Sequence, residues 1–466
     1  MKKLLKITFT LIFTTIIVLG FAMPNLLTGS AAGGWYQQFL PNLNGRTISD
    51  IFFLDSLTGW AVTPYRFQND TAYVLKTTNS GDTWFIVNSR IGQFVGHNKV
   101  KFLNSLTGFV CGVYQTNNFE GLSKSIDGGS NWVSIDVPNV TYNDLSIYNE
   151  DTIWLAANES LVGGVYRTTN GGATLEQQFS GGNQNPNRIY MYNARIGFMC
   201  NSSAASPNIY KTTNSGVNWN VNLPGEYFFD IHFTDSLTGW KCMPGVIAGD
   251  SSVKKTTNGG VNWFKQTLPS GGIITAPAIG KFAFVNADTI YGVGSAAFYG
   301  GGQFRGIIFR TINGGNNWLF QVPDTTIHIS SYSYAQFVNG KTGWAYSQTS
   351  GVHTINGGDT NWVLGVTQIS SEIPKAYRLY QNYPNPFNPK TNIKYSVKSQ
   401  TSNVKLIVFD ILGKQIAELV NQKQTAGTYE VDFSGNGYSS GIYFYQLIVT
   451  NGMEVFRQTK KMILIK

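Results

Sequence analysis

An eight-residue pattern recurs seven times along this chain of 466 residues and constrains its fold more than any other feature. Its first copy is Thr-Thr-Asn-Ser-Gly-Asp-Thr-Trp at 77–84. The glycines at the fifth position are Gly81, Gly129, Gly172, Gly216, Gly260, Gly315 and Gly358, and they are 48, 43, 44, 44, 55 and 43 residues apart. A period in the forties with strand-like flanks is typical of four-stranded propeller blades, so seven copies predict a seven-bladed β-propeller.

The residue types of the pattern predict a turn. Asn or Asp at the third position can accept hydrogen bonds from the backbone that follows, and glycine tolerates a positive φ. The tryptophan can bury its ring between neighbouring strands. We therefore expect a structural role for Asn79, Gly81, Trp84, Asp127, Gly129, Trp132, Asn214, Gly216, Trp219, Asn258, Gly260, Trp263, Asn313, Gly315 and Trp318. Calcium binding is the alternative, but six of the seven copies carry neutral Asn, so we predict no metal and no cofactor.

A second repeat precedes the first by about twenty residues. It reads Phe-Leu-Asp-Ser-Leu-Thr-Gly-Trp at 53–60 and recurs at 102–109 and 233–240. Each blade then consists of strand A, this turn, strand B, a variable loop, strand C, the Asn-x-Gly turn and strand D. Because successive strands alternate in direction, both repeated turns fall on one rim, here called the repeated-turn rim. The variable loops fall on the opposite side, here called the variable face, where we expect function to reside.

Two segments compete to complete the ring. Residues 34–41 resemble a strand D that has no blade of its own, and they could join the last blade and so remove an open sheet edge. Residues 362–366 could fill the same place, and the sequence leaves this choice open.

The Asn-x-Gly turn resembles the Asp-box, or BNR repeat, of sialidase-like propellers. The paired Leu-Thr-Gly-Trp and Thr-Asn-Gly-Gly-x-x-Trp repeats are most similar to propellers of the photosystem II assembly and stability factor type. The resemblance covers about 46–366. It implies a fold and leaves the function open, because such propellers include both binding proteins and glycosidases.

The C-terminal region has a different pattern. Pro374, Pro384, Pro386 and Pro389 interrupt the repeats, and strand-like runs follow at 392–397, 404–410, 429–433, 442–450 and 461–465. Short alternating strands over about 90 residues predict a small Ig-like β-sandwich, which makes the whole chain all-β.

Four segments of this region carry a second resemblance. They are Leu-Tyr-Gln-Asn-Tyr-Pro-Asn-Pro-Phe-Asn-Pro at 379–389, Val-Phe-Asp-Ile-Leu-Gly-Lys at 408–414, Ser-Gly-Ile-Tyr-Phe-Tyr at 440–445 and Lys-Lys-Met-Ile-Leu at 460–464. Together they closely resemble the type A C-terminal sorting domain of the type IX secretion system. That resemblance implies a Bacteroidota-like outer membrane, the type IX machinery as a partner, export to the cell surface or medium, and later removal of the tail. The alternative is an adhesive sandwich that stays attached.

The N-terminus predicts an export signal. Lys2, Lys3 and Lys6 precede an apolar run at 7–21, and small residues at 30–32 offer a cleavage site. The run is short for a bilayer span, and no later segment qualifies, so we expect no membrane span in the mature protein. The predicted domains are a signal peptide at 1–32, a propeller at 33–366, a linker at 367–378 and a sorting domain at 379–466.

The charge distribution argues against nucleic acid as a partner. The net charge of +9 divides into +3 for residues 1–32, +7 for 375–466 (12 basic, 5 acidic) and −1 for the stretch between (19 basic, 20 acidic). A body without a basic stripe lacks the charge that phosphate binding requires. Cys111, Cys200 and Cys242 occupy a repeat position that holds valine in another copy, Val62, which predicts free, buried thiols.

Two functions remain. The first is non-catalytic binding of an unknown extracellular protein or glycan, with candidate contacts in variable loops at Tyr65, Arg66, Tyr114, Phe119, Tyr227, Phe298, Tyr299 and Arg305. The second is a sialidase-like glycoside hydrolase, which needs a general acid and a nucleophile. Carboxylates on the variable face are Asp70, Glu120, Glu159, Glu226 and Asp250. No sialidase-type arginine cluster is recognisable, so we predict no catalytic residues and favour binding.

Overall fold

The structure is a computed structural model and describes most of the chain after the N-terminal segment. The described residues are 34–66, 70–92, 96–113, 121–135, 140–157, 163–180, 185–201, 207–243, 253–269, 274, 276–299, 302–324, 326–358, 363–364, 367–370, 372–400, 402–435, 438–452 and 454–465. The predicted signal peptide at 1–32 therefore lies outside them. Within the described part no helix could span a bilayer.

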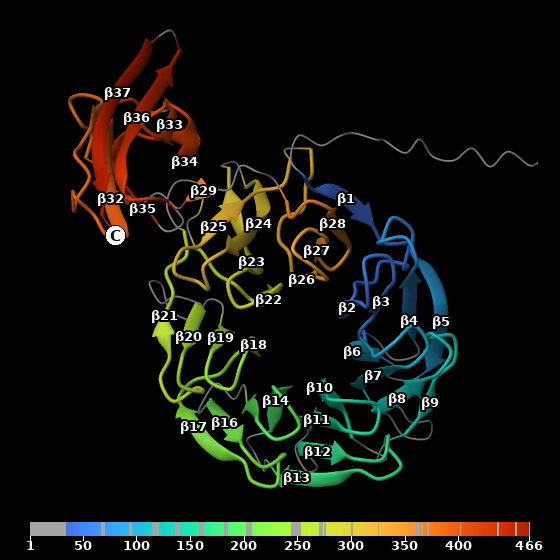
Figure 1. Ribbon diagram of the computed structural model, residues 1–466. Coiled ribbons are helices and arrows are strands. Elements are labelled where there is room, and N and C mark those ends of the chain that lie inside the picture. Colours follow the sequence, from blue (N-terminus) through green and yellow to red (C-terminus); the bar gives the residue numbers. More distant parts are fainter. Residues whose placement is uncertain are drawn as a thin grey trace, which may run out of the picture.

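Small antiparallel sheets arranged around a ring form the larger body of the molecule (Figure 1). Up to residue 364, the described residues form seven of them, here called blades one to seven. Blade one contains β2 (Asp50–Phe53), β3 (Gly59–Val62), β4 (Asp70–Thr77) and β5 (Phe85–Gly92); blade two contains β6 (Gly96–Phe102), β7 (Gly108–Val113), β8 (Leu122–Ser125) and β9 (Val133–Ser134); blade three contains β10 (Tyr142–Ile147), β11 (Ile153–Ala157), β12 (Gly164–Thr168) and β13 (Glu176–Ser180). Blade four contains β14 (Pro186–Met191), β15 (Gly197–Asn201), β16 (Asn208–Thr212) and β17 (Asn220–Pro224), and blade five contains β18 (Asp230–Phe233), β19 (Gly239–Cys242), β20 (Val253–Thr256) and β21 (Phe264–Lys265). Blade six contains β22 (Lys281–Phe284), β23 (Ile290–Phe298), β24 (Phe304–Thr311), β25 (Leu319–Gln321) and β29 (Val363–Leu364), and blade seven contains β26 (Tyr334–Phe337), β27 (Gly343–Tyr346), β28 (Ser350–Thr354) and β1 (Tyr36–Phe39). The predicted β-propeller fold is confirmed.

The N-terminal strand closes the ring. β1 pairs with β28 of blade seven, with Tyr36 opposite His353 and Phe39 opposite Ser350. The competing segment forms β29 instead and adds a fifth strand to blade six by pairing with β25. β1, from the start of the propeller, is thus the outer strand of blade seven, and it covers the edge that β28 would otherwise leave open.

Aromatic stacks between adjacent blades form much of the propeller core. Trp60 of blade one stacks on Phe102 of blade two with ring centroids 3.6 Å apart, and Trp344 of blade seven stacks on Phe53 of blade one at 3.7 Å. In both stacks the tryptophan ends one Leu-Thr-Gly-Trp-type turn and the phenylalanine begins another. The second repeat therefore encodes the contact between neighbouring blades, and the pair Trp344–Phe53 closes that series around the ring.

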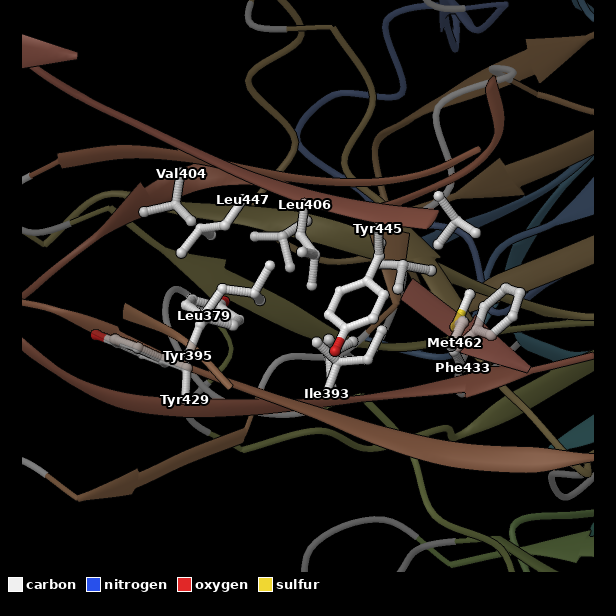
Figure 2. Packing of buried hydrophobic residues seen from close by; sticks show 14 of the residues in the cluster. Leu379, Ile393, Tyr395, Val404, Leu406, Tyr429, Phe433, Tyr445, Leu447 and Met462 are labelled. Carbon is white, nitrogen blue, oxygen red and sulfur yellow. The ribbon is translucent and has the colours of Figure 1, made fainter. Parts of the chain in front are cut away.

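The C-terminal region forms a β-sandwich of two four-stranded sheets, as predicted. One sheet contains β30 (Thr367–Ser370), β35 (Gly427–Ser434), β32 (Lys390–Val397) and β31 (Arg378–Leu379); the other contains β34 (Gln415–Gln424), β33 (Ser402–Phe409), β36 (Gly441–Asn451) and β37 (Glu454–Leu464). Figure 2 shows Ile393, Tyr395 and Tyr429 of the first sheet facing Leu406, Tyr445 and Leu447 of the second. All six side chains are buried because alternate residues of each strand point inward.

Three strands of the sandwich, β30, β31 and β34, lie where the sequence indicated none. β30 falls inside the segment expected to be a linker, 367–378, and pairs with β35 of the sandwich. β34 reads Gln-Ile-Ala-Glu-Leu-Val-Asn-Gln-Lys-Gln, and its many polar residues concealed a strand that pairs with β33. Lys390 Nζ also donates to the Asn316 carbonyl at 3.2 Å, which links the sandwich to blade six.

The three cysteines are free and buried, as predicted. Burial, the main cause in each case, raises the pKa of Cys200 to about 12. It also raises the pKa of Cys111 and of Cys242 well above the usual value. All three therefore remain protonated thiols at neutral pH.

Candidate functional site

The repeated-turn rim uses its polar side chains for its own hydrogen bonds. In blade five, Thr256 Oγ1 donates to Asn258 Oδ1 at 3.0 Å and accepts from the Gly260 amide at 3.0 Å, while Asn258 Oδ1 accepts from the Asn262 amide at 2.9 Å. Gly260 has a φ of +88°, which a residue with a Cβ adopts only with strain. The Gly259 amide donates to the Leu237 carbonyl at 2.8 Å, so the two repeated turns of the blade lie together.

The other blades repeat this arrangement. The Thr or Ser hydroxyl accepts from the glycine amide in every copy, at Thr77, Ser125, Thr168, Thr212, Thr311 and Thr354. In the turn of the second repeat, Asp or Asn accepts from two backbone amides, at Asp55, Asn104, Asn149, Asn193, Asp235, Asn286 and Asn339. Trp362, the tryptophan of the last copy, lies outside the described residues. The Asp, Asn, Thr and Ser side chains at these repeated positions therefore hold the turns of the rim.

A long hairpin in blade six brings three of the predicted contact residues together on the variable face. The hairpin joins β23 to β24 and carries Phe298, Tyr299, Phe304 and Arg305 near its tip. The rings of Phe298 and Phe304 lie 5.1 Å apart, and Arg305 Cζ lies 5.3 Å from the centroid of the Tyr299 ring. Phe304 is 51% exposed and Tyr299 is 47% exposed, so the cluster presents aromatic surface to solvent.

Loops on both sides position this hairpin. A β-bulge between Val293 and Ala296 interrupts the ladder, and Ser295 Oγ donates to the Ala276 carbonyl at 2.7 Å. Bulges bend a strand and redirect its end, so this bulge helps to set the direction of the hairpin. On the other side, the Gly306 amide donates to the Ile329 carbonyl at 2.7 Å. A side chain at Gly306 would clash with Tyr332, whose ring lies 2.5 Å from the site of a Cβ.

A pocket of about 410 Å³ opens beside the hairpin, on the variable face of blade seven. Residues 328–331 and 333, from the loop that precedes β26, form one wall, and residues 347–350, from the turn between β27 and β28, form the other. The Ser333 amide donates to the Tyr346 carbonyl at 2.8 Å, and the Ile48 amide donates to the Gln348 carbonyl at 2.9 Å. Backbone hydrogen bonds therefore fix both walls.

The other predicted contact residues lie apart from this cluster. Arg66 follows β3 in blade one, and its Nη1 donates to the Gly45 carbonyl at 3.1 Å. Tyr65, next to it, lies with its backbone against Gly96. Tyr227 is half-buried between blades four and five, with its ring 5.8 Å from that of Phe229. Tyr114 and Phe119 lie outside the described residues.

Glu226 is the candidate carboxylate whose side chain the structure describes. It lies on the variable face, where it contacts the ammonium of Lys241 and accepts from Lys254 Nζ at 3.1 Å. Burial opposes ionisation of Glu226, but the hydrogen bonds and charges of the two lysines outweigh it and lower the pKa. Glu226 is therefore ionised at neutral pH and bound to cations, which suits an ion pair. The side chain of Asp70 and residues Glu120, Glu159 and Asp250 lie outside the described part.

The innermost strands carry alternating charges around the ring. Asp50, Lys99, Asp144, Arg188, Asp230, Lys281 and Tyr334 occupy equivalent positions, each three residues before the end of strand A. Asp230 accepts from Lys281 Nζ at 3.1 Å and from the Phe282 amide of the next blade at 2.9 Å. Asp50 and Asp144 accept from the next blade in the same way, from the amides of Val100 and Ile189.

The pKa values of these inner residues reflect their enclosure. Burial lowers the pKa of Lys281, but attraction to Asp230, Asp50 and Asp144 outweighs it and raises the pKa above the usual value. Lys101 lies two residues after Lys99 in β6 and is exposed to solvent, but the inner strands surround it. Desolvation and the repulsion of Lys281 therefore lower its pKa. The inner strands thus join neighbouring blades through charge and hydrogen bonds.

Sequence reasoning missed the pocket and the charged inner ring for different reasons. Aligning strand A of the seven repeats would have revealed the ring, because its members share one position before the turn. The pocket offered no such signal. Its walls come from two loops that differ from blade to blade, and its residues are mostly serine, a residue type that is common in loops generally.

Comparison with known proteins identifies the tail. Residues 381–466 match the secretion system C-terminal sorting domain, which confirms the sequence interpretation. A type IX sorting domain indicates export to the cell surface or the extracellular space. None of the curated proteins matches the chain.

Solved structures support the fold. A structure described as YCF48 bound to D1 peptide is 16% identical, covers 69% of this chain and 97% of its own, and superposes with a TM-score of 0.50. PorZ, a surface component of the type-IX secretion system of Porphyromonas gingivalis, is 11% identical and covers 90% of this chain and 60% of its own, with a TM-score of 0.47. At such low identity the first likeness establishes a propeller fold, and neither establishes a function.

Proposed function

We propose that this exported chain is a non-catalytic binding protein that recognises an extracellular protein or glycan through its variable face. The observation that carries the proposal is the blade-six hairpin, where Phe298, Tyr299, Phe304 and Arg305 form one exposed cluster. Clustered aromatic residues with an arginine are typical of the residues that dominate binding energy. The bulge and the flanking loops hold the cluster in place, which reduces the entropy lost on binding.

A hydrolase is the competing class, and the described residues give it no support. Hydrolysis of a glycoside requires one carboxylic acid that is protonated at neutral pH and a nucleophile close to it. Glu226 has a lowered pKa and two lysine partners, the opposite of what a general acid needs. We therefore assign Glu226 a structural role in blade five.

A matched pair of variants tests the binding proposal. Phe304 in the cluster and Phe264 in outer strand β21 are similarly exposed, at 51% and 59%. The mature protein and the two variants Phe304→Ala and Phe264→Ala would be passed over arrays of bacterial and host polysaccharides and purified surface proteins. We expect Phe304→Ala to weaken binding at least tenfold, which corresponds to about 1.4 kcal/mol. Phe264→Ala should bind like the parent protein. Equal binding by both variants would refute a site at the hairpin.

The sorting tail permits a second test. We propose that the sandwich is the sorting unit and that it begins with β30, so truncation after residue 366 removes it whole and keeps β29 paired with β25. The truncated chain should fold and remain in the periplasm, because the machinery that crosses the outer membrane reads the missing domain. Fractionation of cells that produce both forms measures this. A truncated chain that still reaches the medium would show that the tail has another role.

A further inference from the structure

The geometry points to the pocket between loops 328–333 and 347–350 as a binding site for a neutral oligosaccharide. This inference rests on the proposed function and specifies its ligand. The pocket volume, about 410 Å³, lies within the range of roughly 300–1,000 Å³ that small-molecule sites occupy. It also lies next to the aromatic hairpin, because the Ile329 carbonyl in its wall accepts the Gly306 amide of β24.

The pocket gathers polar side chains that the protein leaves without partners. Among the described residues, the side chains of Ser330, Ser331, Ser333, Gln348 and Thr349 make no hydrogen bond within the chain. A serine or threonine hydroxyl can both donate and accept, and so can the amide of glutamine. Sugar hydroxyls have the same dual character, so each of these groups can pair with a sugar hydroxyl in either direction.

Ser347 differs from these residues, because its hydroxyl already makes hydrogen bonds within the wall. Its Oγ donates to the Ser350 carbonyl at 2.8 Å and accepts from the Ser350 amide at 3.1 Å, so it holds the turn. The neighbouring Gln348 and Thr349 side chains are exposed at the tip of that turn. The wall therefore combines one structural hydroxyl with free polar groups on a fixed backbone, and such preorganisation limits the entropy lost on binding.

The composition of the lining selects a neutral ligand. No aspartate, glutamate, lysine or arginine is among the described residues that line the pocket. An acidic sugar or a phosphate would call for a cation with charge-assisted hydrogen bonds. Arg305, the cation on the adjacent hairpin, lies over the Tyr299 ring. A neutral sugar needs only the hydroxyls and the amide that are present.

Two exposed aromatic residues belong to strands that contact the walls of the pocket. Phe304 precedes Gly306 by two residues, which places it roughly 7 Å along the strand from the contact with Ile329. Phe39 of β1 is 65% exposed and lies opposite Ser350, a residue of the other wall. Aromatic faces provide flat apolar surfaces that suit the C–H face of a pyranose ring. A polar pocket with exposed aromatic residues on the neighbouring strands thus fits an oligosaccharide whose end occupies the pocket.

A protein partner fits the pocket less well. The energetic centre of a protein interface is a desolvated, mainly apolar patch, whereas eight of the nine residues that line this pocket are polar. Inserting a peptide side chain would desolvate these hydroxyls without supplying enough partners. Binding to a protein is therefore an outcome that the experiment must be able to detect.

Two exposed threonines allow a matched test. Thr349 lies at the pocket and Thr213 lies on the repeated-turn rim, and neither side chain has a partner among the described residues. We would measure the full mature chain and its Thr349→Trp and Thr213→Trp variants on an array of neutral oligosaccharides with sialylated and sulfated counterparts. We expect the parent chain to bind neutral members, Thr349→Trp to weaken that binding at least tenfold by filling the pocket, and Thr213→Trp to leave it unchanged.

Smaller substitutions separate filling from the loss of hydrogen bonds. Gln348→Ala and Ser331→Ala each remove one free polar group and should weaken binding about 2- to 10-fold, in line with a typical hydrogen bond. Binding only to charged oligosaccharides, or equal binding by both tryptophan variants, would overturn the pocket assignment. If a protein is bound instead and Phe304→Ala abolishes that binding, the oligosaccharide is wrong and the proposed function stands. If Phe304→Ala changes no binding at all, the hairpin is not the site, and if the parent chain binds no member of either kind of array, the proposed function itself fails.

Discussion

On the repeated-turn rim, Thr256 donates to Asn258 and accepts from Gly260, whereas on the variable face the hydroxyl of Thr349 has no partner among the described residues. Both threonines stand in turns at the end of a blade, yet one holds the backbone and the other faces solvent. The difference shows where binding can evolve without loss of stability. A side chain that satisfies a buried amide is costly to change, and an exposed side chain without a partner is free to change.

The largest difference in stability between the two regions should come from substituting one aromatic residue in each. Trp344 is buried, stacks on Phe53 across the junction of blades seven and one, and donates Nε1 to the Ser80 carbonyl at 2.7 Å. Trp344→Ala should lower the free energy of unfolding by about 3–5 kcal/mol, as the loss of a large core side chain does. Phe304→Ala on the variable face should cost less than about 0.5 kcal/mol. Urea denaturation of both variants measures this, and similar losses would remove the distinction.

Acid should act on the buried residues and spare the exposed ones. Burial, with a contribution from Arg90, lowers the pKa of His97 to about 4. The unfolded chain binds a proton near pH 6.5 and the folded chain does not, so stability falls as the pH drops from 6.5 to 4. The loss from His97 should reach up to about 3 kcal/mol at pH 4, and it ends once the folded state is protonated.

A variant pair isolates this contribution. His97→Gln should make the unfolding free energy depend less steeply on pH between 6.5 and 4, and the remaining slope comes in part from His232 and His353, whose pKa burial also lowers to about 4. Thr213→Val, on the repeated-turn rim, changes no titratable group and should leave that dependence as it is in the parent chain. A parent protein with constant stability over this range would contradict neutral burial of His97.

The smallest effect concerns the two threonine hydroxyls. Thr256→Val keeps the shape of the side chain but leaves the Gly260 amide without its acceptor, which should cost about 1–3 kcal/mol. Thr349→Val removes a hydroxyl that has no partner in the chain and should change stability by less than about 0.5 kcal/mol. Thermal denaturation compares the two. Equal losses would mean that Thr349 also supports the fold.

Most of the fold could be predicted from the repeats in the sequence. The Asn-x-Gly turn requires a positive φ at its glycine, and Gly260 has a φ of +88°. Because each blade contains one such turn, the spacing of these glycines predicted the blades. The closure of the ring by β1 was one of two possibilities, since the sequence of an outer strand does not state which blade it joins. β30 and β34 were missed because short or polar strands carry little alternation, and tertiary pairing decides them.

The candidate site was predictable only in part. Phe298, Tyr299 and Arg305 were identified as exposed loop residues, and the hairpin brings them together because they are close in the sequence. Their neighbour Phe304 and the pocket walls were missed, since Gly306 of β24 meets Ile329 through a contact between a strand of one blade and a loop of the next. Such contacts depend on how blades six and seven are placed, which no single repeat encodes.

The most direct test measures stability and oligosaccharide binding on the same two variants, Thr256→Val and Thr349→Trp. If the repeated-turn rim holds the fold and the variable face binds, Thr256→Val should lose stability and retain the affinity of the parent chain. Thr349→Trp should retain stability and lose affinity at least tenfold. Loss of affinity in Thr256→Val while it is folded, with unchanged affinity in Thr349→Trp, would contradict the account.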